Sequence, residues 1–202
     1  IGSGSTDRVD GGVRDFGVEI IKAMNEVGML VDVSHCGDRT TLDAIEISPK
    51  PIAITHSNCR ALIDHPRVKT DEAIKACAAK GGVMGITGVR NFVSKTDPTT
   101  IVNYVDHIDH VVKLVGIDHV GVGTDSDLYG YDDTSPEMNK MLRGAYKDSY
   151  AFREKIDIDG FDHPRKMFDL TEELLRRKYS DANILAVLGG NFQRLLTATW
   201  GG

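Results

Sequence analysis

The sequence predicts an α/β fold, the C-terminal part of a (β/α)8 barrel of the TIM type. Short runs rich in Val and Ile recur along the first part of the chain, as expected for parallel strands that are buried on both faces. Segments with helical spacing of apolar residues separate these runs. A complete barrel has eight strands and about 250 residues. We therefore expect residues 1–202 to form a single domain, about half of a barrel, that lacks the N-terminal strands.

Apolar spacing and end signals give each element its type. Helices are expected where apolar residues recur every three or four positions, with Thr70 as a cap and Pro98 in a first turn. Glycines such as Gly28 and Gly81 end helices. Strands are expected where a few apolar residues run together between turn residues. In chain order, we expect a helix over 13–27, a strand over 30–34, a helix over 38–48, a strand over 52–55, a helix over 70–80, a strand over 83–87, a helix over 97–115 and a strand over 119–123.

The chain changes character after the fourth predicted strand. A long polar stretch with four tyrosines and little apolar periodicity follows, and we expect it to form a lid or rim segment. Extra helices complete the chain, the second capped by Ser180 and the third by Asn191. The expected segments are the lid over 128–160, with a helix near 137–152, and helices over 164–179, 180–188 and 191–199.

Composition excludes several classes of protein. The net charge of −6 gives no general attraction to nucleic acid, so no nucleic-acid partner is expected. No apolar run approaches the roughly 18 residues that a membrane span needs. The three cysteines show neither disulfide nor zinc-finger spacing. The chain opens on Ile1 in loop composition, so we expect the natural protein to begin upstream, and the compartment stays open.

Two of the predicted strands end in a histidine. His35 and His56 are 21 residues apart, one at each strand end, and neighbouring parallel strands lie only about 5 Å apart. Ligands gather at the carboxyl ends of such strands, and imidazole is the commonest protein ligand for zinc. Asp125 follows the fourth strand, where a carboxylate can hold and deprotonate a metal-bound water. The spacing alone leaves another reading open, in which the histidines are hydrogen-bonded rim residues and Asp125 caps a turn.

Five short motifs occur in a fixed order over nearly the whole chain. They are DVSH at 32–35, ITHSN at 54–58, HIDH at 107–110, GVGTDSD at 121–127 and GGNF at 189–192. Taken together they resemble the membrane dipeptidase (renal dipeptidase) family, which are zinc metallopeptidases of the amidohydrolase superfamily. On this resemblance the chain corresponds to the C-terminal half to two-thirds of a family member.

The resemblance implies a (β/α)8 barrel with a site for two zinc ions. By position, His35 and His56 match the family's ligands of the second zinc. Asp125 matches the aspartate that contacts the bridging water and handles its proton. Arg67, eleven residues after His56, matches the arginine that contacts the substrate carboxylate. An arginine suits that role because a guanidinium binds a carboxylate through two parallel hydrogen bonds.

The sequence departs from the family pattern at two places. The family's first-strand His-x-Asp pair and its bridging glutamate have no counterpart in these 202 residues, so half of the metal site is absent from the chain. Ser126 stands where the family usually has an aromatic residue, which concerns the shape of the nearby pocket. His107 and His110 lie three apart on a predicted helix, but the matching family residues are not ligands, and we expect none here.

The resemblance implies a zinc-dependent dipeptidase that hydrolyses small dipeptides by a metal-bound hydroxide. A first alternative is another amidohydrolase that acts on small amides or lactones, because a shared scaffold does not fix the substrate. A second is a non-catalytic fragment that lacks half of the metal site. Its open strand edges would need a second copy, as in a homodimer, or the missing N-terminal half. For a bacterial protein, the resemblance is compatible with a cytoplasmic or periplasmic location.

Overall fold

A parallel β-sheet organises the molecule. The computed structural model describes residues 1–128, 130–131 and 134–200. Within them, the sheet has the order β1-β2-β3 and every pairing is parallel, as the sequence predicts. Ala53 is paired with Val83, and Met84 with Val120. The described residues form an open sheet of three strands and not a closed barrel. The strands are β1 (Ala53–Ser57), β2 (Val83–Ile86) and β3 (Val120–Val122).

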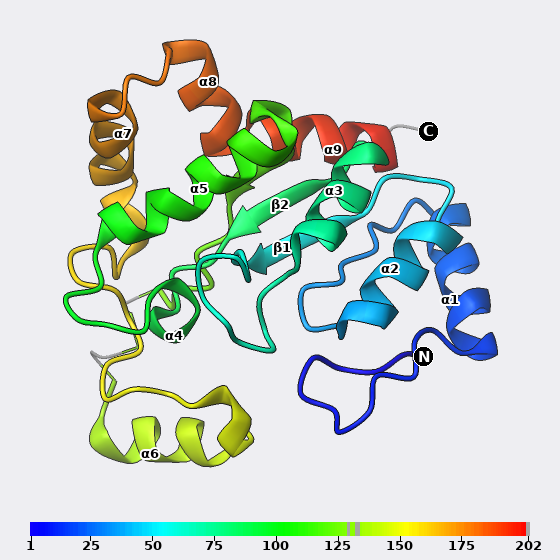
Figure 1. Cartoon of the computed structure of the whole chain (residues 1–202), viewed down its shortest axis with the longest axis horizontal. Helices are drawn as coiled ribbons and strands as arrows, with labels where there is room; N and C mark the ends of the chain where they lie inside the picture. The colour runs from blue at the N-terminus through cyan, green and yellow to red at the C-terminus, as the bar shows by residue number, and fades with distance from the viewer. Residues whose placement is uncertain (129, 132–133, 201–202) are drawn as a thin grey trace.

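Helices follow the strands in succession and cover one face of the sheet. Neighbouring helices pack side by side in chain order, α1 on α2, α2 on α3 and α3 on α5, and α3 and α5 also contact the sheet (Figure 1). This order is the one expected when each strand returns through a helix on the same side. The helices are α1 (Asp15–Glu26), α2 (Asp38–Ile47), α3 (Asp71–Ala79), α4 (Arg90–Val93) and α5 (Ile101–Val115).

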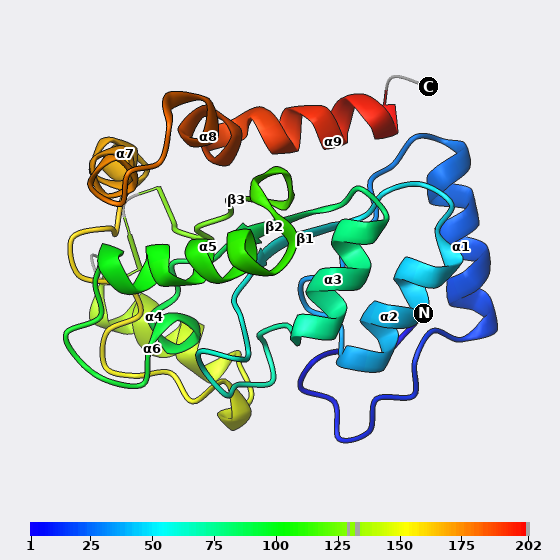
Figure 2. The ribbon, with the colours of Figure 1, turned by 45° about the horizontal axis from the view of Figure 1, so that its top comes forward.

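The last helix covers the other side of the sheet. Helix α9 contacts β2 and β3, and Figure 2 shows it on the side of the sheet away from α3 and α5. Within the described residues, no helix combines the length and apolarity that crossing a membrane requires. The remaining elements are η1 (Ile117–His119), α6 (Pro136–Gly144), η2 (Asp148–Tyr150), η3 (Pro164–Lys166), α7 (Met167–Arg176), α8 (Asp181–Leu185), the π-helical η4 (Ala186–Gly190) and α9 (Asn191–Trp200).

Side chains alternate between the two faces of the strands, and each face is buried. Ile54 and Met84 join the main hydrophobic cluster, which includes Tyr104 of α5. The Tyr104 hydroxyl donates a hydrogen bond to the Ile86 carbonyl oxygen at 2.7 Å, so this buried polar atom is satisfied. On the opposite face, Ala53 and Val83 pack against Leu195 and Phe192 of α9. The sequence predicts strands buried on both faces, and the structure confirms it.

The predicted first strand, residues 30–34, is wrong as a strand. It is reduced to one isolated parallel bridge, between Asp32 and Ala53. The Val33 and Val31 backbones still exchange hydrogen bonds with Ala53. The ladder stops there because the Thr55 N–H donates to the Asp32 carboxylate at 3.0 Å instead of to a backbone carbonyl. A side chain thus replaces the next rung, and the four predicted strands become three and a bridge.

Several helix boundaries also differ from prediction. Thr70 and Ser180 cap their helices as expected. Helix α5 begins three residues after Pro98, because Thr100 forms a capping box there. Asn191 is not a cap. Its side chain donates to the carbonyl oxygens of Ile117 and Val120, both at 2.7 Å, and holds α9 on the strand instead.

The segment over 128–160 contains less helix than predicted. Helix α6 ends at Gly144, well short of residue 152, and only the short η2 follows. Residues 129 and 132–133 of this segment lie outside the described part of the chain. The arginine near the end of α6, Arg143, turns back and donates to the carbonyl oxygens of Arg153 and Glu154. This contact holds the return limb, the stretch around Arg153 and Glu154, beside the helix. The chain therefore does not continue as a further helical turn.

Candidate active site

The structure brings His35 and His56 together at one end of the sheet. His56 belongs to β1, and His35 lies in the turn after the bridge at Asp32. Their Nε2 atoms are 2.9 Å apart and their ring centroids 4.9 Å apart. The register of β1 against β2 shifts between Ile54 and Ser57, and His56 lies within this irregular part of the strand. Such irregularities re-aim side chains and are common beside functional sites.

A hydrogen-bond network fixes the orientation of the His56 ring. The hydroxyls of Ser34 and Thr55 both donate to the Asp32 carboxylate, at 2.6 and 2.7 Å. The Thr55 oxygen lies 2.8 Å from His56 Nδ1. Because the Thr55 proton is already committed to Asp32, His56 Nδ1 must donate to Thr55, which leaves the lone pair on Nε2 free. A fixed tautomer of this kind is typical of metal-binding histidines.

Asp32 and Thr55 are site residues that our sequence reasoning missed. The available signal is a charged residue in the middle of the apolar run over 30–34. A buried strand seldom carries an unpaired carboxylate, so Asp32 needs partners. Its hydrogen bonds from Ser34 and Thr55 hold the pKa of the carboxyl below its usual value despite burial. Asp32 therefore stays ionised and accepts hydrogen bonds from the hydroxyls of Ser34 and Thr55.

Arg67 lies buried beside the two histidines. Its side chain is 1% exposed, and its Nη atoms donate to the Ser34 carbonyl oxygen and to His35 Nε2, the latter at 3.3 Å. The guanidinium carbon lies 5.3 Å from the centre of the Phe92 ring. Within the described residues Nε has no hydrogen-bond partner, and no carboxylate forms an ion pair with the guanidinium. Burying a cation is costly when no carboxylate pairs with it directly, so this position, as the described residues leave it, is suited to an anionic ligand.

Asp125 lies directly beyond β3 and lines the same cavity as His35 and Arg67. Its backbone adopts a left-handed conformation, with φ at 58°, which aspartate tolerates better than most residues. The residue is exposed at the rim, yet the protein around the carboxyl group removes part of its hydration and raises its pKa. The positive charge of Arg67 acts in the opposite direction.

Aromatic side chains close the cavity from the other side. They come from the segment over 128–160 and from α4, and they stack on one another: the Tyr150 ring lies 4.9 Å from Tyr146 and 5.6 Å from Phe152. Only about 30 Å³ of space remains between them and the polar groups, about one water molecule. The segment thus covers the candidate site. The aromatic lining residues are Phe92, Tyr131, Tyr146, Tyr150 and Phe152.

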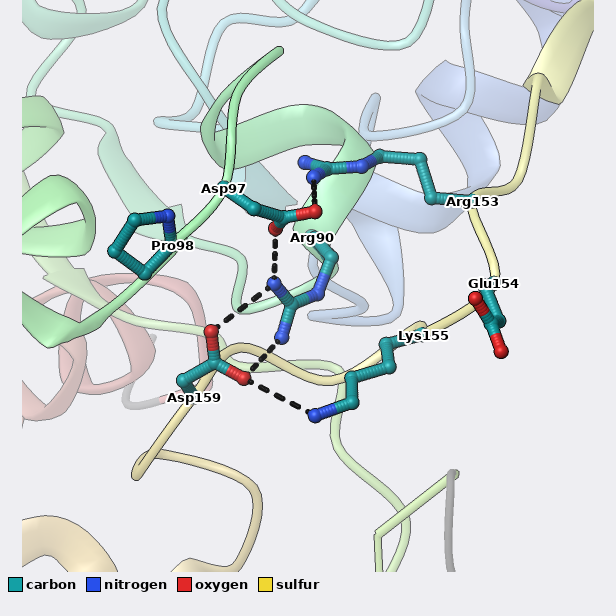
Figure 3. Close-up of a pocket in the computed structure, with 7 residues that line it drawn as sticks. All are labelled: Arg90, Asp97, Pro98, Arg153, Glu154, Lys155 and Asp159. Atoms are coloured by element: carbon teal, nitrogen blue, oxygen red, sulfur yellow. Dashed lines mark hydrogen bonds and ion pairs between the residues drawn. The ribbon is translucent and has the colours of Figure 1, made fainter.

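A charged cluster anchors the return limb of this covering segment. Arg90 of α4 donates to the carboxylates of Asp97 and Asp159, Arg153 pairs with Asp97, and Lys155 lies 3.6 Å from Asp159 (Figure 3). A cavity of about 490 Å³ adjoins the cluster. Each of these three cations already has a carboxylate partner, so the cluster serves to tie the segment to the body of the protein.

The histidine pair supplies part of a metal site. Two nitrogen ligands of a tetrahedral zinc ion lie about 3.3 Å apart, given Zn–N bonds of about 2.0–2.1 Å, and the separation of 2.9 Å is close to this value. Within the described residues, no cluster of three or more His, Cys, Asp and Glu side chains has ligand geometry. Because a structural or catalytic zinc needs at least three protein ligands, the residues present fit as one part of a metal centre.

The two histidines of the HIDH motif, His107 and His110, each have a hydrogen-bond partner away from His35 and His56. His107 is 1% exposed, accepts the Cys59 N–H at 3.2 Å and reaches the Val93 carbonyl oxygen at 2.9 Å. His110 pairs instead with Asp71, at 2.8 Å. The two side chains have separate partners and do not converge on a common point.

Comparison with known proteins supports the resemblance. A sequence model described as membrane dipeptidase (Peptidase family M19) matches residues 2–143. Dipeptidase verJ of Clonostachys rogersoniana is 31% identical over 186 residues, which are 92% of this chain and 41% of the relative. An uncharacterized dipeptidase of Schizosaccharomyces pombe is 37% identical over 120 residues, or 58% of this chain and 29% of the relative. The chain spans less than half of the length of these curated relatives.

Solved structures agree with the fold. An amidohydrolase from Pseudomonas aeruginosa has a TM-score of 0.86 and 34% identity, over all of this chain and 62% of its own. A metallopeptidase from Rhodobacter sphaeroides, liganded with a phosphinate mimic of the dipeptide L-Ala-D-Ala, has a TM-score of 0.75 and 20% identity, over 94% of this chain and 48% of its own. The second likeness concerns the fold alone. With the match over residues 2–143 and the order of its motifs, the chain belongs to the membrane dipeptidase family, Peptidase family M19.

Proposed function

We propose that the protein carrying this chain is a metal-dependent dipeptidase built on a (β/α)8 barrel, of which the chain supplies three strands and their outer helices. One observation carries the proposal. A buried guanidinium that forms no ion pair with any carboxylate of the described residues lies 3.3 Å from His35 Nε2, in a cavity lined by aromatic side chains. Family membership and the dipeptide mimic bound by the Rhodobacter sphaeroides metallopeptidase support the same substrate class.

In this proposal His35 and His56 would hold a zinc ion, and ligands from outside this chain would complete a centre of two ions. The fixed tautomer of His56 supports this role because it leaves the Nε2 lone pair available. When bound, zinc polarises a carbonyl oxygen and lowers the pKa of bound water. Asp32 and Thr55 would then act by keeping the ring oriented, as outer partners of metal ligands do.

Arg67 would bind the C-terminal carboxylate of the dipeptide. A guanidinium and a carboxylate pair through two parallel hydrogen bonds, and burial strengthens them. Ser34 and Phe92 already hold the group in place, so little conformational freedom is lost on binding.

Asp125 would take up a proton during the attack on the peptide carbonyl and deliver it to the leaving amine. A base that also serves as an acid works best when its pKa lies near the working pH. The raised pKa of this carboxyl, together with its place on the shared cavity, supports the assignment.

The experiment compares the full-length protein with its Arg67→Ala variant on matched substrates. We expect hydrolysis of dipeptides with a free C-terminal carboxylate, and a rise in KM of about 100-fold in the variant, as for loss of a charge-assisted bidentate contact. Amidated dipeptides should be poor substrates for both proteins. Faster turnover of lactones or of amides without a carboxylate, unaffected by Arg67→Ala, would contradict the proposal and favour another amidohydrolase.

A further inference from the structure

His65 lies where the loop that carries Arg67 meets the covering segment. It is buried, at 9% exposure, in the loop that joins β1 to α3. Its Nδ1 accepts the backbone N–H of Arg67 at 3.0 Å, and its Nε2 lies 3.2 Å from the Tyr150 carbonyl oxygen. A carbonyl oxygen only accepts, so Nε2 carries the proton and Nδ1 offers a lone pair. One neutral tautomer therefore satisfies both contacts, and burial favours it by lowering the pKa of His65.

The His65 ring also supports the Arg67 side chain through the ring of Phe92. Its centroid lies 4.7 Å from that of Phe92, and the Phe92 ring in turn lies 5.3 Å from the Arg67 guanidinium carbon. The backbone of Arg67 and its charged end thus both depend on the position of one imidazole. Rigid support of this kind keeps a binding group within reach of its ligand.

Tyr150 connects the same imidazole to the covering segment. The Tyr150 carbonyl oxygen accepts from Asn91 Nδ2 at 2.7 Å as well as from His65, and its hydroxyl lies 3.4 Å from His35 Nδ1. When the segment is in place, the Tyr150 carbonyl oxygen holds the His65 proton on Nε2. Without that acceptor the proton is free to move to Nδ1. Nδ1 could then no longer accept the hydrogen bond from the Arg67 N–H, because both groups would be donors.

We propose that His65 is a positioning residue for substrate recognition: its tautomer, set by the Tyr150 carbonyl oxygen, holds Arg67 in place for the dipeptide carboxylate. The inference rests on the proposed role of Arg67. Carboxylate binding and the position of the covering segment are thereby coupled, because His65 contacts both.

The chain contains its own control for the local turn. His163-Pro164-Arg165 repeats the tripeptide His65-Pro66-Arg67, and the Arg165 N–H donates to His163 Nδ1 at 2.9 Å, as Arg67 does to His65. Arg165 is exposed, whereas Arg67 is buried. The turn is therefore encoded locally, and only the copy at His65 joins the candidate site.

The test uses the full-length protein and two substitutions that separate the nitrogens of the ring. In His65→Asn, the amide oxygen replaces Nδ1, since asparagine readily accepts the N–H two residues on. In His65→Gln, the amide nitrogen replaces Nε2 and the acceptor for Arg67 is lost. We expect His65→Gln to raise KM for a dipeptide about tenfold, with kcat within about threefold, and His65→Asn to keep KM within about threefold of wild type. His163→Gln should leave both constants unchanged.

Two further readouts do not depend on turnover. Nitrogen NMR shifts of wild type should show His65 protonated on Nε2 and not on Nδ1. The dissociation constant of a phosphinate mimic of L-Ala-D-Ala should follow the same order as KM among the variants. A His65 proton on Nδ1, or equal constants for wild type and His65→Gln, would overturn the inference. Absence of dipeptide hydrolysis in wild type would instead refute the proposed function. The NMR measurement would still show which nitrogen of His65 carries the proton.

Discussion

At the scale of single residues, the candidate site depends on a few side chains whose protons have fixed places. The sequence motifs pointed to His35, His56 and Asp125 because each follows a predicted strand, and the structure places the two imidazoles in contact and Asp125 on the same cavity as His35. The part that sequence could not supply is the network from Asp32 through Thr55. It depends on a three-dimensional contact between a bridge residue and β1.

Asp125→Asn tests the proton-transfer role. The substitution keeps the shape of the side chain and removes its ability to take up a proton. We expect kcat of the full-length protein to fall by about 10²- to 10⁴-fold, with the metal content unchanged. Steady-state kinetics and elemental analysis of the same sample measure both quantities. Turnover at the wild-type level would remove Asp125 from this role.

His107 predicts a pH dependence of stability. Burial lowers the pKa of His107 from its ordinary value of 6.5 to about 4, so the unfolded chain binds a proton more readily than the native one. The neutral imidazole therefore stabilises the native state above pH 6.5, and this contribution is lost as the pH falls towards 4. The loss amounts to about 3 kcal/mol at most.

Urea denaturation of wild type and His107→Gln at a series of pH values isolates this effect. The stability difference between the two proteins should be largest near neutral pH and should shrink below pH 6.5, the ordinary pKa of the imidazole. Glutamine retains a donor for the Val93 carbonyl oxygen and does not titrate, which makes it the matched control. A difference that stays constant with pH would show that His107 is not held neutral.

At the scale of elements, periodicity predicted the parallel strands and most helices because burial on both faces leaves a strong apolar signal. It failed where side chains compete with the backbone. Asp32 replaces a rung of the ladder, and Thr100 starts α5 later than Pro98 suggested. The side-chain amide of Asn191 donates to backbone carbonyl oxygens beside and in β3 instead of capping a helix end. Such exchanges depend on tertiary neighbours and leave no periodic trace.

A substitution at Gly121 tests how closely α9 packs against the sheet. A Cβ atom at this position would lie 2.7 Å from the Phe192 ring, which is too close for an unshifted structure. We expect Gly121→Ala to lower the free energy of unfolding by about 1–3 kcal/mol, as overpacking does. The double variant Gly121→Ala with Phe192→Leu should recover part of the loss. Equal urea midpoints for wild type and Gly121→Ala would contradict this packing.

At the scale of the whole molecule, the described residues form an open parallel sheet of three strands, and the closed barrel belongs to the proposal. Three parallel strands lie between their outer helices and α9, and the candidate site stands at one end of the sheet. Large apolar side chains remain exposed, among them Phe168 at 84% and Trp200 at 64%. These surfaces, and the open strand edges, agree with the prediction that a second copy or an N-terminal half covers them. That prediction stays untested, as does a non-catalytic role for the chain alone.

In the proposed enzyme the imidazoles of His35 and His56 share one metal ion. An anomalous difference map recorded at the zinc edge from crystals of the full-length protein tests it most directly. We expect a strong peak bonded to both Nε2 atoms, at about 2.0–2.1 Å from each. A fully occupied zinc elsewhere in the molecule, with these two nitrogens still bonded only to protein, would contradict it.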